Sequence, residues 1–293
     1  MKKTLFSGTA TALITPFKEN GALDLEGLER LIEYQIEGNI QAIVLAGTTG
    51  EGSTLSFEEF GLLIGEANRI IKRRVPLIAG TGCNNTAASL RLSLEAEKRG
   101  ADGILLVTPY YNKTTQEGLV AHYFSIADRV QLPMLVYNVP SRTGMTITAE
   151  TCKRLSEHPR IHGIKEASGN LSSIADIAAS CPSFDIYSGN DDQILPILSI
   201  GGIGVISVLS NVAPAQVQRI CALYEQGEIK KATQEQLRFL PLIRLLFSQI
   251  NPIPIKCAAE LIGLPSGAPR LPLVPCTDTL KGELKKALMA AGI

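Results

Sequence analysis

The chain has 293 residues, of which 45% are hydrophobic and 19% are charged. This composition excludes a disordered or low-complexity protein, because it supplies enough apolar surface for at least one large core. Basic residues (Lys and Arg) and acidic residues (Asp and Glu) number 28 each, so the net charge is zero. A neutral chain has no general attraction to nucleic acids or acidic membranes, and we expect neither as a partner.

No apolar run reaches the roughly 18 residues that a membrane-spanning helix needs. The first residues, Met1 to Gly8, contain neither a signal-peptide core nor an arginine-rich transit segment. We therefore expect a cytoplasmic protein. The six cysteines form no C-x-x-C pair, and the three histidines (His122, His158 and His162) have no metal-ligand spacing, so we expect no metal site.

Short apolar runs rich in β-branched residues recur along the first two thirds of the chain. Each ends just before a polar or glycine-containing loop, and all are apolar throughout, as in parallel strands buried on both faces. The runs are residues 10–14, 42–46, 75–80, 103–107, 133–137, 161–165, 184–188 and 203–207. Their carboxyl ends follow one another at intervals of between 19 and 34 residues.

The segments between these runs have the pattern of amphipathic helices. Apolar residues keep helical spacing from Leu25 to Ile36, and Gly38 is placed to end that helix. Capping boxes are expected at Ser56 and Thr114. Eight strands with helical crossovers predict a (β/α)8 barrel. The alternative, a doubly wound sheet, usually has a glycine-rich nucleotide loop after its first strand, and this chain has none there.

After about residue 208 the strand pattern stops, and four helices are expected at residues 214–224, 229–247, 253–261 and 277–291. The first of these would complete the barrel. We therefore divide the chain into a catalytic barrel, residues 1–224, and a C-terminal helical extension, residues 225–293.

In such a barrel the active site lies at the carboxyl ends of the strands, and Lys165 ends the sixth strand. Strand side chains alternate, so Lys165 should point into the barrel while Ile164 faces the helices. Gly163 would leave room near the amine. Burial lowers the pKa of a lysine, and a neutral amine can form a Schiff base with a ketone. A buried lysine paired with a structural carboxylate is the equally weighted alternative.

Other polar residues follow the same strand ends. Tyr137, Tyr111 and Thr48 carry hydroxyls that can relay protons, although packing and turn capping explain them as well. Arg142 can hold a carboxylate, or it can be a solvated loop residue. Thr49 and the backbone of residues 47–52 can hold an anion. For Glu51 and Glu166 we favour structural roles over general-base catalysis.

Three motifs, in order and on the expected strands, resemble the dihydrodipicolinate synthase (4-hydroxy-tetrahydrodipicolinate synthase) family. They are Gly47-Thr48-Thr49-Gly50-Glu51, the segment from Tyr137 to Gly144, and the segment from Gly163 to Asn170. The resemblance covers nearly the whole chain. It implies a lyase, a pyruvate-dependent synthase of the class I aldolase type that serves lysine and diaminopimelate biosynthesis, with no cofactor beyond the covalent Schiff base.

The resemblance also assigns roles. Lys165 would bind pyruvate as a Schiff base, whose enamine attacks L-aspartate 4-semialdehyde. Tyr137, Thr48 and Tyr111 match the proton relay, with Tyr111 reaching in from a neighbouring subunit of a homotetramer built as a dimer of dimers. Substrate-binding positions match Thr49, for the pyruvate carboxylate, Arg142, for that of the semialdehyde, and Gly189 and Ile206, which line the pocket.

The same superfamily includes N-acetylneuraminate lyase and 2-keto-3-deoxygluconate aldolase, which share the lysine and a similar glycine-rich loop. Arg142 and the stretch from Glu166 to Asn170 favour the synthase over these sugar-acid enzymes. A barrel that binds pyruvate without catalysis is a further alternative. The complete set of Lys165, Tyr137, Thr48 and Tyr111 argues against it, because a scaffold needs none of them.

One departure from the family pattern concerns inhibition by lysine. Members that lysine inhibits bind it with a glutamate and histidines at positions that match Ala88, Phe57 and Phe60 here, although Asn84 and Tyr110 fit. Without the carboxylate, the ammonium group of lysine has no opposite charge. We predict weak or no inhibition by lysine, measured as turnover against lysine concentration; inhibition at sub-millimolar lysine would contradict this.

Overall fold

Eight parallel strands form a closed barrel in the computed structural model, which describes residues 2–293. Each strand pairs with its neighbours in chain order, and β1 closes the barrel against β8. The predicted (β/α)8 architecture is confirmed. The strands are β1 (Gly8–Ala12), β2 (Ala42–Leu45), β3 (Leu77–Gly80), β4 (Gly103–Val107), β5 (Met134–Asn138), β6 (Ile161–Glu166), β7 (Asp185–Ser188) and β8 (Gly204–Ser207).

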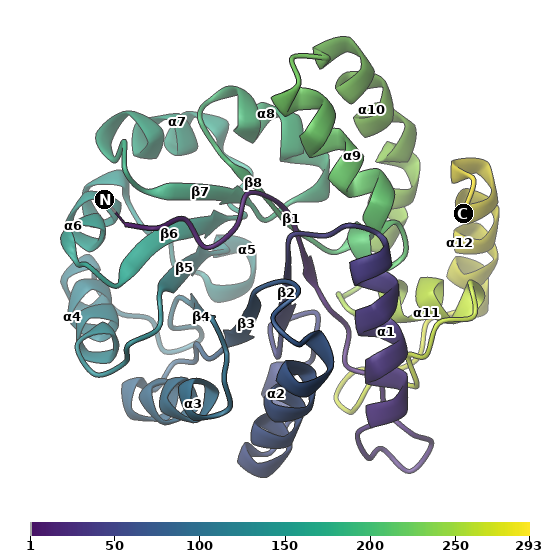
Figure 1. Cartoon of the computed structure of the whole chain (residues 1–293), viewed down its shortest axis with the longest axis horizontal. Coiled ribbons are helices and arrows are strands. Elements are labelled where there is room, and N and C mark those ends of the chain that lie inside the picture. Colours follow the sequence, from purple (N-terminus) through teal and green to yellow (C-terminus); the bar gives the residue numbers. More distant parts are fainter. Residues whose placement is uncertain (1) are drawn as a thin grey trace.

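Helices surround the barrel, and the last ones gather on one side of it beside α1 (Figure 1). The helices of the barrel part are α1 (Leu25–Glu37), α2 (Phe57–Ile71), α3 (Thr86–Lys98), α4 (Gln116–Ala127), α5 (Pro140–Thr143), α6 (Ala149–Glu157), α7 (Leu171–Ser180), α8 (Ile194–Ser199) and α9 (Pro214–Glu225). Short 3-10 turns are η1 (Gly52–Thr54), η2 (Asp191–Gln193) and η3 (Leu209–Asn211). The last three helices are α10 (Ile229–Leu246), α11 (Ile253–Leu261) and α12 (Asp278–Ala291).

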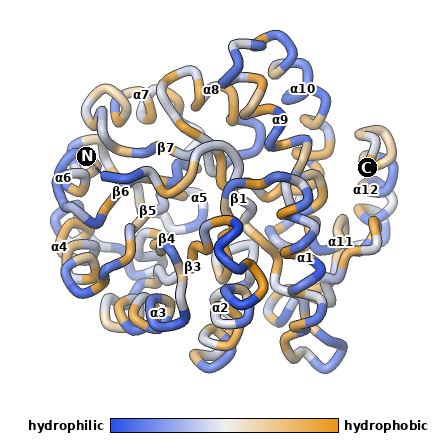
Figure 2. Tube along the Cα trace, viewed as in Figure 1, coloured by the Kyte–Doolittle hydropathy of each residue, from blue (hydrophilic) through white to orange (hydrophobic). Residues whose placement is uncertain are grey.

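The strands are buried on both faces because two separate layers pack against them. Ile164 belongs to the layer between the sheet and the helices, whereas Tyr137, Tyr187 and Ile206 belong to the layer that fills the barrel. Apolar stretches mark β3 and β4 in Figure 2, whereas β1, β6 and β7 also carry polar residues, and the surrounding helices alternate in hydropathy. As alternation predicts, Lys165 lies on the inner side of β6, and its side chain is almost fully buried.

The C-terminal helices share the core of the barrel helices. Phe239 of α10 and Leu284 of α12 are fully buried in the same apolar cluster as Leu28 of α1. The predicted boundary after residue 224 falls at the end of α9, and the division into a barrel and an extension stays a prediction. Side chains of α10 and α11 nevertheless reach the strand ends, as described below.

Two local expectations were wrong. The first strand begins and ends two residues earlier than expected, because beyond Ala12 the chain leaves the ladder and Ile14 donates its N–H to the Asn211 side chain. The capping box at Ser56 is confirmed, but Thr115 caps α4 in place of Thr114. The Glu117 carboxylate, which a box at Thr114 would need, pairs with Arg154 instead.

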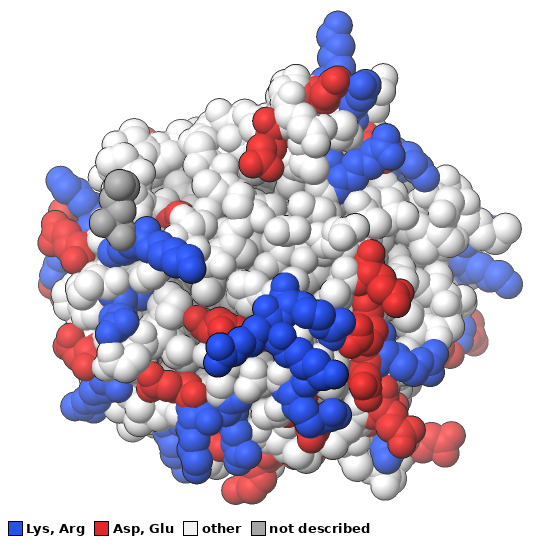
Figure 3. Space-filling view, viewed as in Figure 1, with Lys and Arg blue, Asp and Glu red and all other residues white. Residues whose placement is uncertain are grey.

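The surface carries both charge signs side by side, as the face in Figure 3 shows, in keeping with the zero net charge. None of the helices described in residues 2–293 combines the length and the apolar character needed to cross a membrane.

The space at Gly163 is filled by the neighbouring strand rather than left open at the lysine amine, which corrects the sequence-based interpretation. A Cβ at Gly163 would lie 2.2 Å from the Asp185 carbonyl oxygen. This glycine therefore permits the close approach of β6 and β7.

We predict that Gly163→Ala destabilises the protein by about 1–3 kcal/mol or more, the usual cost of overpacking, because backbone must move to admit the methyl group. The free energy of unfolding in urea measures this. Gly282→Ala is the matched control: it lies within α12 with open space around it and should stabilise by about 0.5–1 kcal/mol. A Gly163→Ala variant as stable as the original chain would contradict the packing described here.

Candidate active site

A cavity of about 520 Å³ opens at the carboxyl ends of the strands. Its walls come from the segments after β2, β4, β5 and β7, from the side chain of Lys165, and from residues 250–252 and 272–273 of the C-terminal part. The cavity is thus the place where the barrel rule puts an active site. Of the residues expected there, it contains Lys165, Tyr137, Thr48, Thr49, Arg142 and Gly189.

Lys165 lies at the inner wall of this cavity and its side chain is 6% exposed. The Nζ atom is 4.4 Å from the centroid of the Tyr137 ring, and β5 and β6 pair these two residues directly. Within residues 2–293, Nζ makes no hydrogen bond or salt bridge. The interpretation of Lys165 as a lysine paired with a structural carboxylate is therefore wrong, because no carboxylate contacts it.

Burial lowers the pKa of Lys165 to about 8, the positive charge of Arg142 acts in the same direction, and the carboxylate of Asp191 opposes both. The amine loses hydration inside the barrel, which disfavours its charged form. Near neutral pH the neutral form of this amine is a minority, but it is far more populated than in an ordinary lysine. A neutral amine that faces a cavity can attack a carbonyl carbon.

Asp191 is a buried carboxylate that the sequence did not single out. It follows β7, and its oxygens accept hydrogen bonds from the Ser207 hydroxyl and from the N–H groups of Val208 (3.0 Å) and Leu209 (2.9 Å). Burial raises the pKa of Asp191, and these three donors oppose the rise. Because Ser207 itself accepts from the Ser210 N–H, its hydroxyl donates to Asp191, which fits an ionised carboxylate.

Three further predicted residues line the cavity around Lys165. Tyr137 is 7% exposed, and burial raises its pKa to about 12, so that the phenol stays protonated near neutral pH. Thr48 and Arg142 are exposed at the mouth, Arg142 from the one-turn helix α5. The guanidinium of Arg142 thus lies at the cavity mouth, whereas the buried phenol of Tyr137 lies next to the Lys165 amine.

The remaining predicted residues occupy different places. Thr49 is buried in the wall, where its Oγ1 accepts from the Asn251 side chain at 3.0 Å, and Gly189 also lines the cavity. Ile206 is fully buried in the inner apolar layer and is not part of the lining. Tyr111 is 92% exposed, has φ +66°, and lies outside the cavity, so this chain does not bring it to Lys165.

The two glutamates have the structural partners that the sequence could not show. Glu51 forms a salt bridge with Lys256 of α11 at 2.7 Å. Glu166 is fully buried and accepts hydrogen bonds from the Asn138 side chain and the Ser168 N–H. Asn251 and Lys256 were missed because the barrel rule points only to strand ends, and these residues lie far along the chain.

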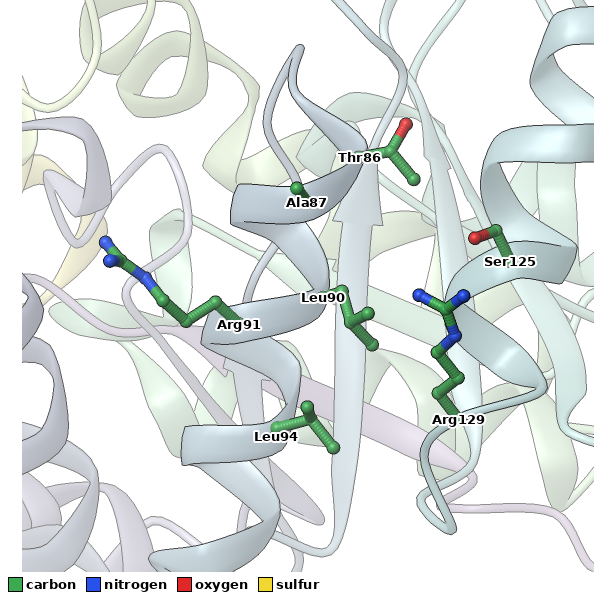
Figure 4. A pocket seen from close by; sticks show the side chains of 7 residues that line it. All are labelled: Thr86, Ala87, Leu90, Arg91, Leu94, Ser125 and Arg129. Carbon is green, nitrogen blue, oxygen red and sulfur yellow. The ribbon is translucent and has the colours of Figure 1, made fainter.

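A second hollow lies on the outside of the barrel between α3 and α4 (Figure 4). Leu90 and Leu94 face Arg129 and Ser125 across it, whereas Arg91 extends to the other side of α3, over the ring of Phe57. Its lining includes no carboxylate or lysine. Among residues 2–293, no group of three or more His, Cys, Asp or Glu side chains is arranged to hold a metal ion.

Comparison with known proteins identifies the family to which this chain belongs. A family model described as the dihydrodipicolinate synthetase family matches residues 5–291. A 4-hydroxy-tetrahydrodipicolinate synthase of Caldicellulosiruptor bescii is 50% identical over 290 residues, which cover 99% of this chain and 98% of that protein. The chain therefore belongs to the dihydrodipicolinate synthetase family, as its three motifs indicated.

Solved structures that resemble this chain belong to the same family. The crystal structure of the dihydrodipicolinate synthase of Thermotoga maritima has a TM-score of 0.96 and 42% identity, over 99% of both chains. The enzyme of Cyanidioschyzon merolae, solved with lysine bound, has a TM-score of 0.96 and 40% identity, also over 99% of both chains. The expected enzyme class, a lyase of the class I aldolase type, is confirmed at the level of the family.

We predict that the rate of Schiff-base formation rises with pH and levels off above about pH 8, because protonation below the pKa of Lys165 removes the lone pair. Asp191→Asn should move the midpoint to lower pH, since the carboxylate raises the pKa of Lys165. The measurement is the initial rate of borohydride-trapped adduct against pH. As a control, Asp128→Asn, on an exposed residue that pairs with His158, should leave the midpoint in place; an unchanged midpoint in Asp191→Asn would contradict the assignment.

Proposed function

We propose that the protein condenses pyruvate with L-aspartate 4-semialdehyde to 4-hydroxy-tetrahydrodipicolinate, the reaction for which its curated relatives are named. The observation that carries the proposal is the environment of Lys165. Its amine is buried, faces the cavity, contacts the Tyr137 ring and makes no salt bridge within residues 2–293. Such an amine has a lone pair to offer a ketone, which is the requirement of a class I aldolase mechanism.

The first half of the reaction forms a nucleophile from pyruvate. The neutral Nζ of Lys165 adds to the C2 ketone carbon, and the carbinolamine loses water to give a protonated Schiff base. Loss of a proton from C3 then gives an enamine. No cofactor takes part, because the iminium itself accepts the electron pair from the C3–H bond. The phenol of Tyr137, next to Nζ, would exchange protons at the oxygen that leaves.

In the second half, the enamine C3 attacks the aldehyde carbon, and the aldehyde oxygen takes up a proton to become the hydroxyl of the product. The amino group of the semialdehyde then attacks C2, closes the ring and releases the Lys165 amine. Arg142 at the mouth would bind the semialdehyde carboxylate, and Thr49 with its loop would bind that of pyruvate. Gly189 would border the substrates directly, and Ile206 would support the cavity floor.

Thr48 would continue the proton relay from Tyr137 toward the mouth, where it lines the cavity. Tyr111 would complete the relay from a neighbouring subunit of a homotetramer. Its 92% exposure supports this arrangement, because a tyrosine that projects from one chain is available to another. The cytoplasm is the proposed location, which the six free cysteines support, since a reducing compartment keeps thiols unpaired.

The test is borohydride reduction in the presence of pyruvate, followed by peptide mass spectrometry. We expect one reduced adduct, on Lys165, and none in Lys165→Ala. Lys281→Ala serves as a control: this lysine of α12 pairs with Glu260 away from the cavity, so its loss should leave the adduct on Lys165. The reaction with L-aspartate 4-semialdehyde is then measured by product formation.

Three outcomes would overturn parts of this proposal. A folded protein that forms no adduct would exclude the Schiff-base mechanism. An adduct without turnover of the semialdehyde would leave a pyruvate-binding barrel or an aldolase for another aldehyde. An adduct on a lysine other than Lys165 would show that the amine at the cavity wall is not the nucleophile.

A further inference from the structure

A second buried lysine, Lys256 of α11, lies near the active site without facing the cavity. Its side chain is 2% exposed, and its Nζ donates to Glu51 Oε1 at 2.7 Å and to the Thr15 carbonyl at 3.1 Å. The Phe17 ring lies on another side of the ammonium, 4.4 Å from its centroid to Nζ. Burial lowers the pKa of Lys256, and Glu51 opposes this. Because Nζ donates to these acceptors and does not face the cavity, Lys256 is not a second nucleophile.

The acceptor Glu51 belongs to the loop that follows β2 and contains Thr48 and Thr49. Its backbone has φ +52°, in the left-handed region that costs an ordinary residue about 1–2 kcal/mol. The side chain is fully buried, and its second oxygen accepts from the Arg270 N–H at 2.8 Å. Two groups of the C-terminal part, the Lys256 ammonium and the Arg270 amide, therefore hold a strained residue of the loop.

The two residues before Glu51 are held as well. The Asn251 side chain donates to Thr49 Oγ1 at 3.0 Å, and the Thr15 hydroxyl donates to the Gly50 carbonyl at 2.6 Å. Because the Thr15 carbonyl also accepts from Lys256, the contacts form one connected network around the loop. Thr49, Gly50 and Glu51 are each fixed by a group outside the loop.

We propose that Lys256, through Glu51, is a positioning residue for the pyruvate carboxylate site. This inference rests on the proposed function, in which Thr49 and the backbone around it bind that carboxylate. A carboxylate needs donors that converge at fixed distances, and a loop with an unfavourable backbone conformation keeps them there only while it is held. Lys256 thus contributes to substrate binding from outside the cavity lining.

A purely structural role for the pair would predict a different result. Removing one partner of a buried salt bridge leaves an uncompensated charge and destabilises a protein whatever the pair does for function. Stability alone therefore does not distinguish the two roles. The informative quantity is the pyruvate concentration that half-saturates adduct formation on Lys165, compared with the rate at saturating pyruvate.

The experiment measures that half-saturation by borohydride trapping in Lys256→Met. We expect it to rise by about tenfold or more, where each tenfold corresponds to about 1.4 kcal/mol of lost binding. The trapping rate at saturating pyruvate should change much less, because Lys165, Tyr137 and Asp191 keep their surroundings.

The double variant Glu51→Gln/Lys256→Met covers the case in which the single variant does not fold. It removes both buried charges, so its melting temperature should recover, while half-saturation stays raised because the link to α11 is absent. Leu284→Ala is the matched control: it removes buried apolar volume from α12, away from the loop, and should lower the melting temperature with half-saturation unchanged.

Two results would overturn the inference: a folded Lys256→Met or double variant with the half-saturation of the original chain, or an equal rise in Leu284→Ala. Failure of the proposed function is distinct from both, since the original chain itself would then form no adduct on Lys165.

Discussion

Closure of the parallel sheet between β1 and β8 limits where every functional group can lie. All carboxyl ends meet at one rim, and the apolar inner layer fills the barrel beneath them. A polar side chain at an inward strand end is then held between this layer and the cavity. Lys165 occupies such a position, and loss of hydration is the main cause of its lowered pKa. Reactivity of the amine thus follows from where the barrel places it.

The two buried lysines show how neighbouring groups determine whether a lysine amine is available as a nucleophile. Lys256 has a carboxylate and a carbonyl at hydrogen-bond distance, which favour its charged form and oppose the effect of burial. Lys165 Nζ lies over the face of the Tyr137 ring, and Asp191 raises its pKa through charge alone, without a hydrogen bond or salt bridge to it. A carboxylate in direct contact would raise the pKa of Lys165 and withdraw its lone pair. Because Asp191 does not contact the amine, the lone pair stays available. The charge of Asp191 still opposes the lowering of the Lys165 pKa by burial.

The C-terminal part of the chain, including α10 and α11, contributes side chains that support the loops around the cavity. Asn251 and Lys256 reach the loop after β2, and the Gln236 side chain of α10 donates to the carbonyl of Asp191 at 2.7 Å. Each of these contacts holds a residue of the cavity wall or a residue close to it. A barrel supplies strand ends at a fixed rim, but the loops that follow them need additional packing to keep one conformation.

The sequence by itself determined the strand and helix order, because buried parallel strands and amphipathic helices have different periods, and it placed Lys165 inside the barrel by alternation along β6. It also grouped Tyr137, Thr48 and Arg142, since strand ends of a barrel share one rim. Only the tertiary structure decided which groups contact each other across large separations: Lys256 with Glu51, Asn251 with Thr49, and Asp191 with the turn after β8. Local sequence patterns do not encode such contacts, because they arise from packing of segments that are distant along the chain.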